Sequence, residues 1–266
     1  MKIIVSHDVD HLYPSDHILK DLIFPKLWIR SLLQLLKGQI SFFTFCSRLW
    51  SVFDKRLNRI PEIIAYDKEM GVHSTFFFGM ANILGMSYSK KKAEKWIHYV
   101  QHKQMAVGVH GVEIFEIERM KQEFEAFKDI TGLNSYGIRT HYVRYDDMTF
   151  DKMAQVGYLF DTSEFNKMNI ELKAPYKIGK MWEFPLHIMD GYIMRNGIDK
   201  AKQNTLKALE EAEKQGLGYF TFLFHDYMFN ARTYPDYKQF YMWFIEHCKA
   251  NYDFVSYNAA IKELEQ

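Results

Sequence analysis

The sequence has little cysteine, no excess of either charge and no long apolar run. Its two cysteines, Cys46 and Cys248, lie far apart and outside any Cys-x-x-Cys motif, which argues against disulfides and favours reduced thiols. The formal net charge of +1 excludes a global field that recruits nucleic acid, and no nucleic-acid-binding motif occurs. No stretch of about 18 uncharged apolar residues exists, so no segment is expected to span a membrane.

The N-terminus also lacks the pattern of a signal peptide. The apolar run at residues 3–5 is too short for one, and acidic residues follow at once. We therefore expect a cytoplasmic protein, at most at the inner face of the membrane. The chain is rich instead in aromatic residues, which make up 17% of it and suit cores, sugar-binding clefts and membrane interfaces.

Apolar runs that suit strands alternate with segments of helical periodicity along most of the chain. Strands are expected over residues 2–5, 72–78, 105–109, 136–138, 158–160, 183–186, 219–224 and 254–256. Helices are expected over residues 61–70, 89–103, 116–131, 147–156, 199–215, 237–250 and 258–264. This alternation predicts an α/β fold with a parallel sheet, and seven or eight strands favour one barrel-like domain over residues 1–266.

One segment, residues 17–59, interrupts the alternation. Apolar residues recur at helical spacing on both sides of Gly38, which predicts a helical insertion of two helices. Eight basic residues stand against only Asp21 and Asp54. A basic, aromatic, amphipathic segment can lie in a lipid headgroup layer, so peripheral contact with an anionic membrane is expected. The alternative is a helical cap packed over a barrel mouth or a dimer interface.

The chain is organised around its first eleven residues. Apolar residues 2–5 predict a buried strand that leads directly into Asp8 and Asp10. Alternation along an extended chain sends both carboxylates to the same side, where they repel unless a cation or a shared proton relieves them. Paired acids at a strand end are typical of a metal or acid–base site. The alternative is two solvated aspartates in a turn.

Other predicted strands also end in polar side chains. The carboxyl ends of parallel strands meet on one face of a barrel, which is where such folds hold their active sites. A single polar residue at a strand end more often has a structural role, but five or six such strand ends together predict a shared site. Its candidate residues are Asp8, Asp10, His110, Arg139, His141, Tyr142, Asp161 and His225.

The order of these motifs resembles that of the polysaccharide deacetylases, carbohydrate esterase family 4. The matching stretches are Ser6-His7-Asp8-Val9-Asp10, Ser74-Thr75-Phe76-Phe77-Phe78, Val107-Gly108-Val109-His110-Gly111, Arg139-Thr140-His141-Tyr142, Gly157-Tyr158-Leu159-Phe160-Asp161-Thr162-Ser163 and Phe222-Leu223-Phe224-His225-Asp226. No single motif is strong, but six stand in the family's order, over nearly the whole chain apart from residues 17–59. The resemblance implies a distorted (β/α)7-type barrel of the glycoside hydrolase and deacetylase kind.

The resemblance further implies a metal-dependent hydrolysis of an amide. Asp10 and His110 would bind a divalent metal, zinc being the first expectation. Asp8 would be the general base toward water that the metal has acidified. Arg139 would hold Asp8 ionised and correctly oriented.

The remaining candidates complete the implied mechanism. The backbone N–H of Tyr142 would meet the oxyanion together with the metal. His225 would protonate the departing amine, and Asp161 would orient a catalytic partner in the same cluster. The implied substrate is an N-acetylated sugar in a polysaccharide or a lipid-linked glycan precursor.

The sequence departs from the family at one position. Ile114 stands four residues after His110, where the family has its second metal-binding histidine, and isoleucine cannot bind a metal. Two protein ligands are too few for a catalytic zinc site, which usually has three. We therefore expect weaker metal binding than in relatives, and tighter binding after Ile114→His. The other nearby donors are Glu113, His7, His11 and His141.

This departure leaves two hypotheses. The first is an active deacetylase, supported by the joint presence of Asp8, Asp10, Arg139 and His225. The second is a catalytically degenerate barrel that binds glycans or serves in assembly, supported by the loss of the histidine at position 114.

Overall fold

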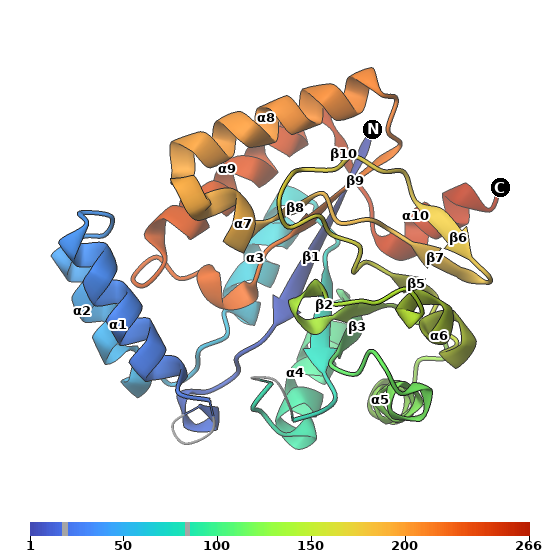
Figure 1. Ribbon diagram of the computed structural model, residues 1–266, viewed down its shortest axis with the longest axis horizontal. Coiled ribbons are helices and arrows are strands. Elements are labelled where there is room, and N and C mark those ends of the chain that lie inside the picture. The colour runs from blue at the N-terminus through green and yellow to red at the C-terminus, as the bar shows by residue number, and fades with distance from the viewer. Residues whose placement is uncertain (18–20, 83–85) are drawn as a thin grey trace.

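The computed structural model describes residues 1–17, 21–82 and 86–266, which form one curled sheet surrounded by helices (Figure 1). The strands are β1 (Lys2–Val9), β2 (Thr75–Gly79), β3 (Ala106–Gly111), β4 (Ile138–Thr140), β5 (Phe160–Asp161), β6 (Tyr176–Ile178), β7 (Met181–Glu183), β8 (Ile188–Met189), β9 (Tyr219–Leu223) and β10 (Asp253–Phe254). The helices are α1 (Ile23–Leu36), α2 (Phe42–Trp50), α3 (Ile60–Met70), α4 (Lys90–His102), α5 (Ile117–Thr131), α6 (Thr149–Val156), α7 (Asp190–Ile193), α8 (Ile198–Lys214), α9 (Pro235–Asn251) and α10 (Tyr257–Leu264).

The strands pair in the order β6-β7-β5-β4-β3-β2-β1-β9-β8, with β10 beside β1. Every pair is parallel except β6 with β7. The sheet curls strongly into a half-barrel, and within the described residues its pairing path does not close. The predicted distorted barrel is thereby confirmed as an open one, with more and shorter strands than expected.

Most elements lie where the periodicity predicts them, because their burial patterns are regular. The N-cap of α4 is Ser89, whose hydroxyl accepts the N–H of Lys92, and α5 ends at Gly132 with φ of 68°. The strand expected over residues 183–186 is wrong beyond Glu183. Pro185 cannot donate to a sheet ladder, so residues 184–187 cross between β7 and β8 without strand structure.

Side chains of β1 alternate between two apolar layers. Ile3, Val5 and Val9 belong to the large hydrophobic cluster between the sheet and its surrounding helices. Ile4 belongs to a smaller cluster inside the curl, where α10 contributes Tyr257. The same alternation turns Ser6, Asp8 and Asp10 toward the inner side, above this small core.

The two predicted inserted helices are α1 and α2, which pack on each other (Figure 1). They lie beside the barrel mouth, where the carboxyl ends of the parallel strands meet. Ser41 caps α2 by accepting the N–H of Thr44. Within the described residues, no helix has both the length and the hydropathy needed to cross a bilayer.

Candidate metal and catalytic site

The acidic pair at the end of β1 is buried. Asp8 is 2% exposed and Asp10 is 9% exposed, so the alternative of two solvated aspartates is wrong. Both carboxylates share the inner side of the curl, as alternation predicts. Their charges therefore have to be balanced by neighbouring side chains or by a bound cation.

Three donor atoms at the mouth of the barrel face one another. The Nε2 atom of His110 lies 3.2 Å from Oδ1 of Asp10 and 3.0 Å from Nδ1 of His141, and the Asp10–His141 distance is 3.5 Å. A tetrahedral zinc ion with bonds of about 2.0–2.1 Å keeps its ligand atoms about 3.3 Å apart. The three distances therefore match one face of a zinc coordination sphere, and all three residues are buried.

The surroundings of these donors also fit a metal. The Nδ1–H of His110 donates to the carbonyl of Arg139 at 3.0 Å, so the lone pair of Nε2 points toward the group. Oδ1 of Asp10 is buried and, among the described residues, faces the imidazoles of His110 at 3.2 Å and His141 at 3.5 Å. Such an oxygen is costly unless a cation or donor reaches it. Asp10, His110 and His141 could therefore hold a divalent ion, with a fourth position open.

The third donor of this group comes from His141 and not from position 114, where Ile114 stands. His141 follows β4 at the start of a short turn, residues 141–143, in which Tyr142 has φ of 62° and Val143 has φ of 44°. Positive φ at two successive non-glycine residues is strained, and such strain is characteristic of functional sites. The turn carries the imidazole of His141 back toward β3 and against His110.

The other donors considered from the sequence lie elsewhere. Ile114 itself is buried in the larger hydrophobic cluster. One oxygen of Glu113 accepts three successive N–H groups, those of residues 114–116. His7 points to the outer side, where it contacts Asp67. His11 packs against the rings of His17 and Tyr227.

Asp8 is held by Arg139, which is completely buried. The guanidinium donates to Oδ1 of Asp8 at 2.8 Å and to the hydroxyl of Ser6 at 2.7 Å. It also lies over the ring of Phe77, 4.6 Å from the ring centre. Arg139 therefore connects the inner apolar core to the site and leaves Oδ2 of Asp8 facing His110, 3.7 Å from Nε2.

His225 completes the group from β9. Its Nδ1 lies 2.8 Å from Oδ1 of Asp190, and its Nε2 lies 3.6 Å from Oδ2 of Asp10. Burial lowers the pKa of His225, but the charges of Asp190, Asp10 and Asp8 outweigh burial and raise that pKa to about 10. The three carboxylates therefore favour the protonated form of the His225 ring.

Asp10 itself stays ionised. Burial opposes its charge, but the hydrogen bond with His110 and the nearby charges of His141 and His225 outweigh burial. Together they hold the pKa of Asp10 well below its usual range. An ionised carboxylate is the form that binds a metal.

Asp161 does not contact Asp10, His110 or His141 directly, but it supports the backbone next to His141 through Ser163. Its two oxygens accept the hydroxyl and the N–H of Ser163, and the Ser163 hydroxyl in turn accepts the N–H of Thr140. Thr140 directly precedes His141, so Asp161 fixes the backbone that presents this imidazole. Burial is the main cause that raises the pKa of Asp161, whose carboxyl lies against the buried carboxyl of Glu183.

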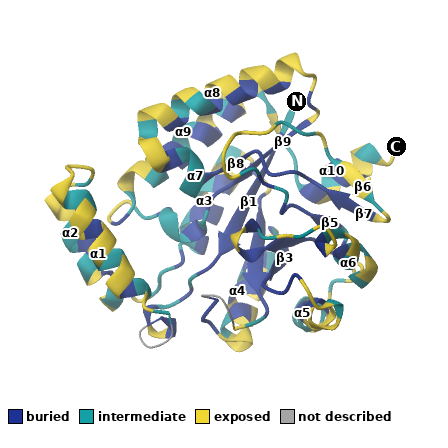
Figure 2. Cartoon of the chain, in the orientation of Figure 1, coloured by how far each residue is buried: buried dark blue, intermediate teal, exposed yellow. Residues whose placement is uncertain are grey.

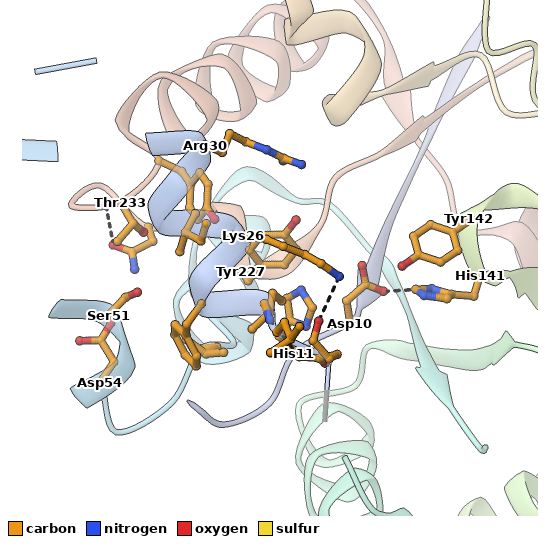
Figure 3. A pocket seen from close by; sticks show the side chains of 18 residues that line it. Asp10, His11, Lys26, Arg30, Ser51, Asp54, His141, Tyr142, Tyr227 and Thr233 are labelled. Atoms are coloured by element: carbon orange, nitrogen blue, oxygen red, sulfur yellow. Dashed lines mark hydrogen bonds and ion pairs between the residues drawn. The ribbon is translucent and has the colours of Figure 1, made fainter. Parts of the chain in front are cut away.

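A cavity of about 700 Å³ opens beside this group, between the barrel mouth and α1 (Figure 3). Asp10, His141 and Tyr142 form one side of it. Lys26 and Arg30 extend from α1 on the opposite side (Figure 3). The cavity is large enough for a sugar ring with its acyl group, and it reaches the donor atoms directly.

Comparison with known proteins gives the fold. No family model and no curated protein matches the sequence. A protein assigned as a polysaccharide deacetylase from Mycobacterium smegmatis aligns with a TM-score of 0.64 at 16% identity, over 98% of this chain and 88% of that chain. An allantoinase aligns with a TM-score of 0.58 at 13% identity, over 95% and 85% of the two chains. A pseudoenzyme of carbohydrate esterase family 4 from Bacillus anthracis aligns with a TM-score of 0.51 at 8% identity, over 97% and 64%.

The chain therefore has the fold of the polysaccharide deacetylases, with a buried Asp-His-His group at its mouth. At these identities the likeness shows the fold alone. Because the three neighbours include a pseudoenzyme and an enzyme of another name, the function has to be argued from the side chains of the site.

Proposed function

We propose that the protein is a metal-dependent hydrolase that removes an acyl group from the nitrogen of an amino sugar in a glycan. The observation that carries this proposal is the set of three buried donor atoms 3.0–3.5 Å apart, with Oδ2 of Asp8 3.7 Å from His110 and Nε2 of His225 3.6 Å from Asp10. Amide hydrolysis needs a base for water and an acid for the departing amine, and these two residues supply both.

Asp10, His110 and His141 would hold the divalent ion. Zinc is the ion we propose, because two imidazoles and one carboxylate are typical ligands of catalytic zinc. When bound, the ion supplies positive charge that acidifies water and polarises the acyl carbonyl. Asp8 takes the proton of the attacking water at Oδ2, because Arg139 occupies Oδ1.

His225 then gives its Nε2 proton to the amine nitrogen as the bond to the acyl carbon breaks. Asp190 keeps the ring in place through Nδ1 and stabilises its charge. We assign the backbone N–H of Tyr142 as the donor to the oxyanion, since this residue lies on the cavity wall next to His141.

Release of acetate from N-acetylglucosamine oligomers, after loading of the protein with zinc, tests the proposed function. We expect turnover that is lost with a chelator and restored by metal, and a fall of about 10²–10⁴ in kcat for His225→Ala. Lys262→Ala, on the exposed side of α10, is the control and keeps full activity. Stoichiometric zinc binding without acetate release from any such oligomer would contradict the proposal.

The second candidate is a glycan-binding barrel without catalysis. The pseudoenzyme neighbour and the replacement of the family's second histidine by Ile114 favour it. It predicts that the oligomers bind with equal affinity to the protein as purified and to His225→Ala, with no acetate released by either.

A further inference from the structure

The α1–α2 hairpin, residues 21–55, exposes an unusual amount of apolar surface. Of the 17 large hydrophobic side chains that are exposed in the described residues, nine lie in this short segment, which Figure 2 shows as largely exposed. They are Leu22, Ile29, Leu32, Leu33, Leu36, Phe42, Phe43, Trp50 and Phe53. A concentration of this kind marks a surface that another body covers.

Helix α1 has three distinct sides, as its 100° advance per residue predicts. Phe24 and Ser31 are buried, and the Ser31 hydroxyl accepts a hydrogen bond from Arg48 of α2. Lys26 and Arg30 lie on the side that faces the cavity. The third side carries the exposed apolar residues Ile29, Leu32, Leu33 and Leu36.

The hairpin is fixed to the barrel by Arg48, one of the eight basic residues of segment 17–59 from which lipid contact was predicted. Arg48 is buried, and its guanidinium donates to the carbonyl of Thr233 and to the side chain of Gln34. Phe24 is 4% exposed and lines the cavity, so it does not belong to the outward apolar side. The apolar side of the hairpin is therefore held outward by a structural attachment.

The charges of the hairpin are one-sided. Lys26, Arg30, Lys37 and Lys55 form no ion pair within the described residues, while Lys20, which precedes the hairpin, lies outside those residues. The two carboxylates of the hairpin are already engaged: Asp21 with His17 and Ser87, and Asp54 with Arg59.

We propose that this face docks the protein on an anionic lipid surface. An amphipathic helix with cations beside its apolar side lies in the headgroup layer, and Phe and Trp rings suit that interface. A second copy of the chain fits less well, because its matching face carries the same unpaired cations and so offers them no opposite charge. Docking places the cavity, which α1 walls, next to the membrane surface.

Sedimentation of the full chain with vesicles tests the proposal. We expect binding to phosphatidylcholine mixed with phosphatidylglycerol at low salt, and much weaker binding to phosphatidylcholine alone. Salt should reduce the binding because it screens the exposed charges. Lys37→Gln and Lys55→Gln are each expected to weaken it by about fivefold.

A matched pair of double variants isolates the apolar contribution. Leu36→Ser with Phe43→Ser changes side chains exposed by 76% and 69%, and is expected to abolish vesicle binding. Phe115→Ser with Met168→Ser changes side chains exposed by 61% and 86% outside the hairpin, and is expected to bind as the unchanged protein does. Thermal unfolding of both variants should match that of the unchanged protein, since all four positions are on the surface.

Three results would overturn the docking: no binding to anionic vesicles at low salt, equal loss in the two double variants, or a dimer that Leu36→Ser with Phe43→Ser converts to a monomer. The last result would assign the face to a second copy. Vesicle binding does not depend on the proposed function. Acetate release from soluble oligomers without vesicle binding would remove only the docking, and the reverse would remove only the hydrolysis.

Discussion

The barrel mouth and the α1–α2 hairpin differ in which side chains they hide from water. At the mouth, charged groups such as Asp8, Arg139 and Asp190 are buried and each meets a partner. In the hairpin, large apolar groups such as Leu36 and Phe43 are exposed. Each arrangement reverses the usual distribution, and each is the place where we propose a ligand: a divalent ion at the mouth and a lipid surface at the hairpin.

The largest contrast should appear when the same substitution is made in the two apolar environments. Phe222 is completely buried in the barrel, and Phe222→Ala is expected to lower the free energy of unfolding by about 3–5 kcal/mol. Phe43→Ala in the hairpin should change it by less than about 0.5 kcal/mol. Urea unfolding measures both. A large loss for Phe43→Ala would show that the hairpin face is packed rather than free.

The next contrast concerns the polar mouth. His141→Ala removes one of three donor atoms and is expected to weaken zinc binding by more than about 100-fold, since even partners behind the ligands contribute 10–100-fold. Titration calorimetry measures the affinity, with the exposed His73→Ala as the control.

The position of the missing family histidine gives the complementary test. With His141 in the group, Ile114→His is no longer expected to tighten zinc binding, contrary to the expectation from the sequence. It places a polar ring in the larger hydrophobic cluster instead. Tighter binding by this variant, or unchanged affinity in His141→Ala, would contradict the assigned ligands.

The smallest contrast is in pH dependence. Burial lowers the pKa of His187 to about 4, and its Nδ1 accepts the N–H of Thr221, which requires a neutral ring. The unfolded chain binds this proton near pH 6.5, so stability from His187 is lost as the pH falls from about 6.5 toward 4. The loss should reach about 2 kcal/mol by pH 5.

Urea unfolding between pH 7 and pH 5 measures this slope. His187→Gln should be less stable than the unchanged protein at pH 7, and this difference in the free energy of unfolding should shrink as the pH falls to 5, whereas the difference for His73→Gln, at an exposed position, should stay constant. An unchanged slope in His187→Gln would assign the acid sensitivity to another group.

Much of the fold could be predicted because its long elements have regular periodicity. Helices α1 and α2, the cap at Ser89 and the stop at Gly132 all follow from local signals. Strands β6 and β8 could not be predicted, because two or three residues carry no readable period. Their existence depends on neighbouring strands in the curled sheet, which is a property of the tertiary structure.

The candidate site was predicted less evenly. Strand-end position was enough to bring Asp8, Asp10, His110, Arg139 and His225 together on one face. The rule also applies to Asp190, which follows β8, but it was missed because β8 itself was unreadable. His141 was named as a candidate and a nearby donor but not as a metal ligand, because a strained turn with positive φ at Tyr142 decides where its imidazole points.

The alternation along β1 has a consequence for how such a protein can change through evolution. Its inner side chains lead from the apolar core to the two acids, while its outer ones, including His7 with Asp67, face the helices. Substitutions can change the side chains of either set one residue at a time. Inserting or deleting a single residue within β1 would exchange the two sets at once and turn Asp8 into the apolar outer layer. The chemical identity of the site residues can therefore change, but their spacing of two residues along β1 has to be kept.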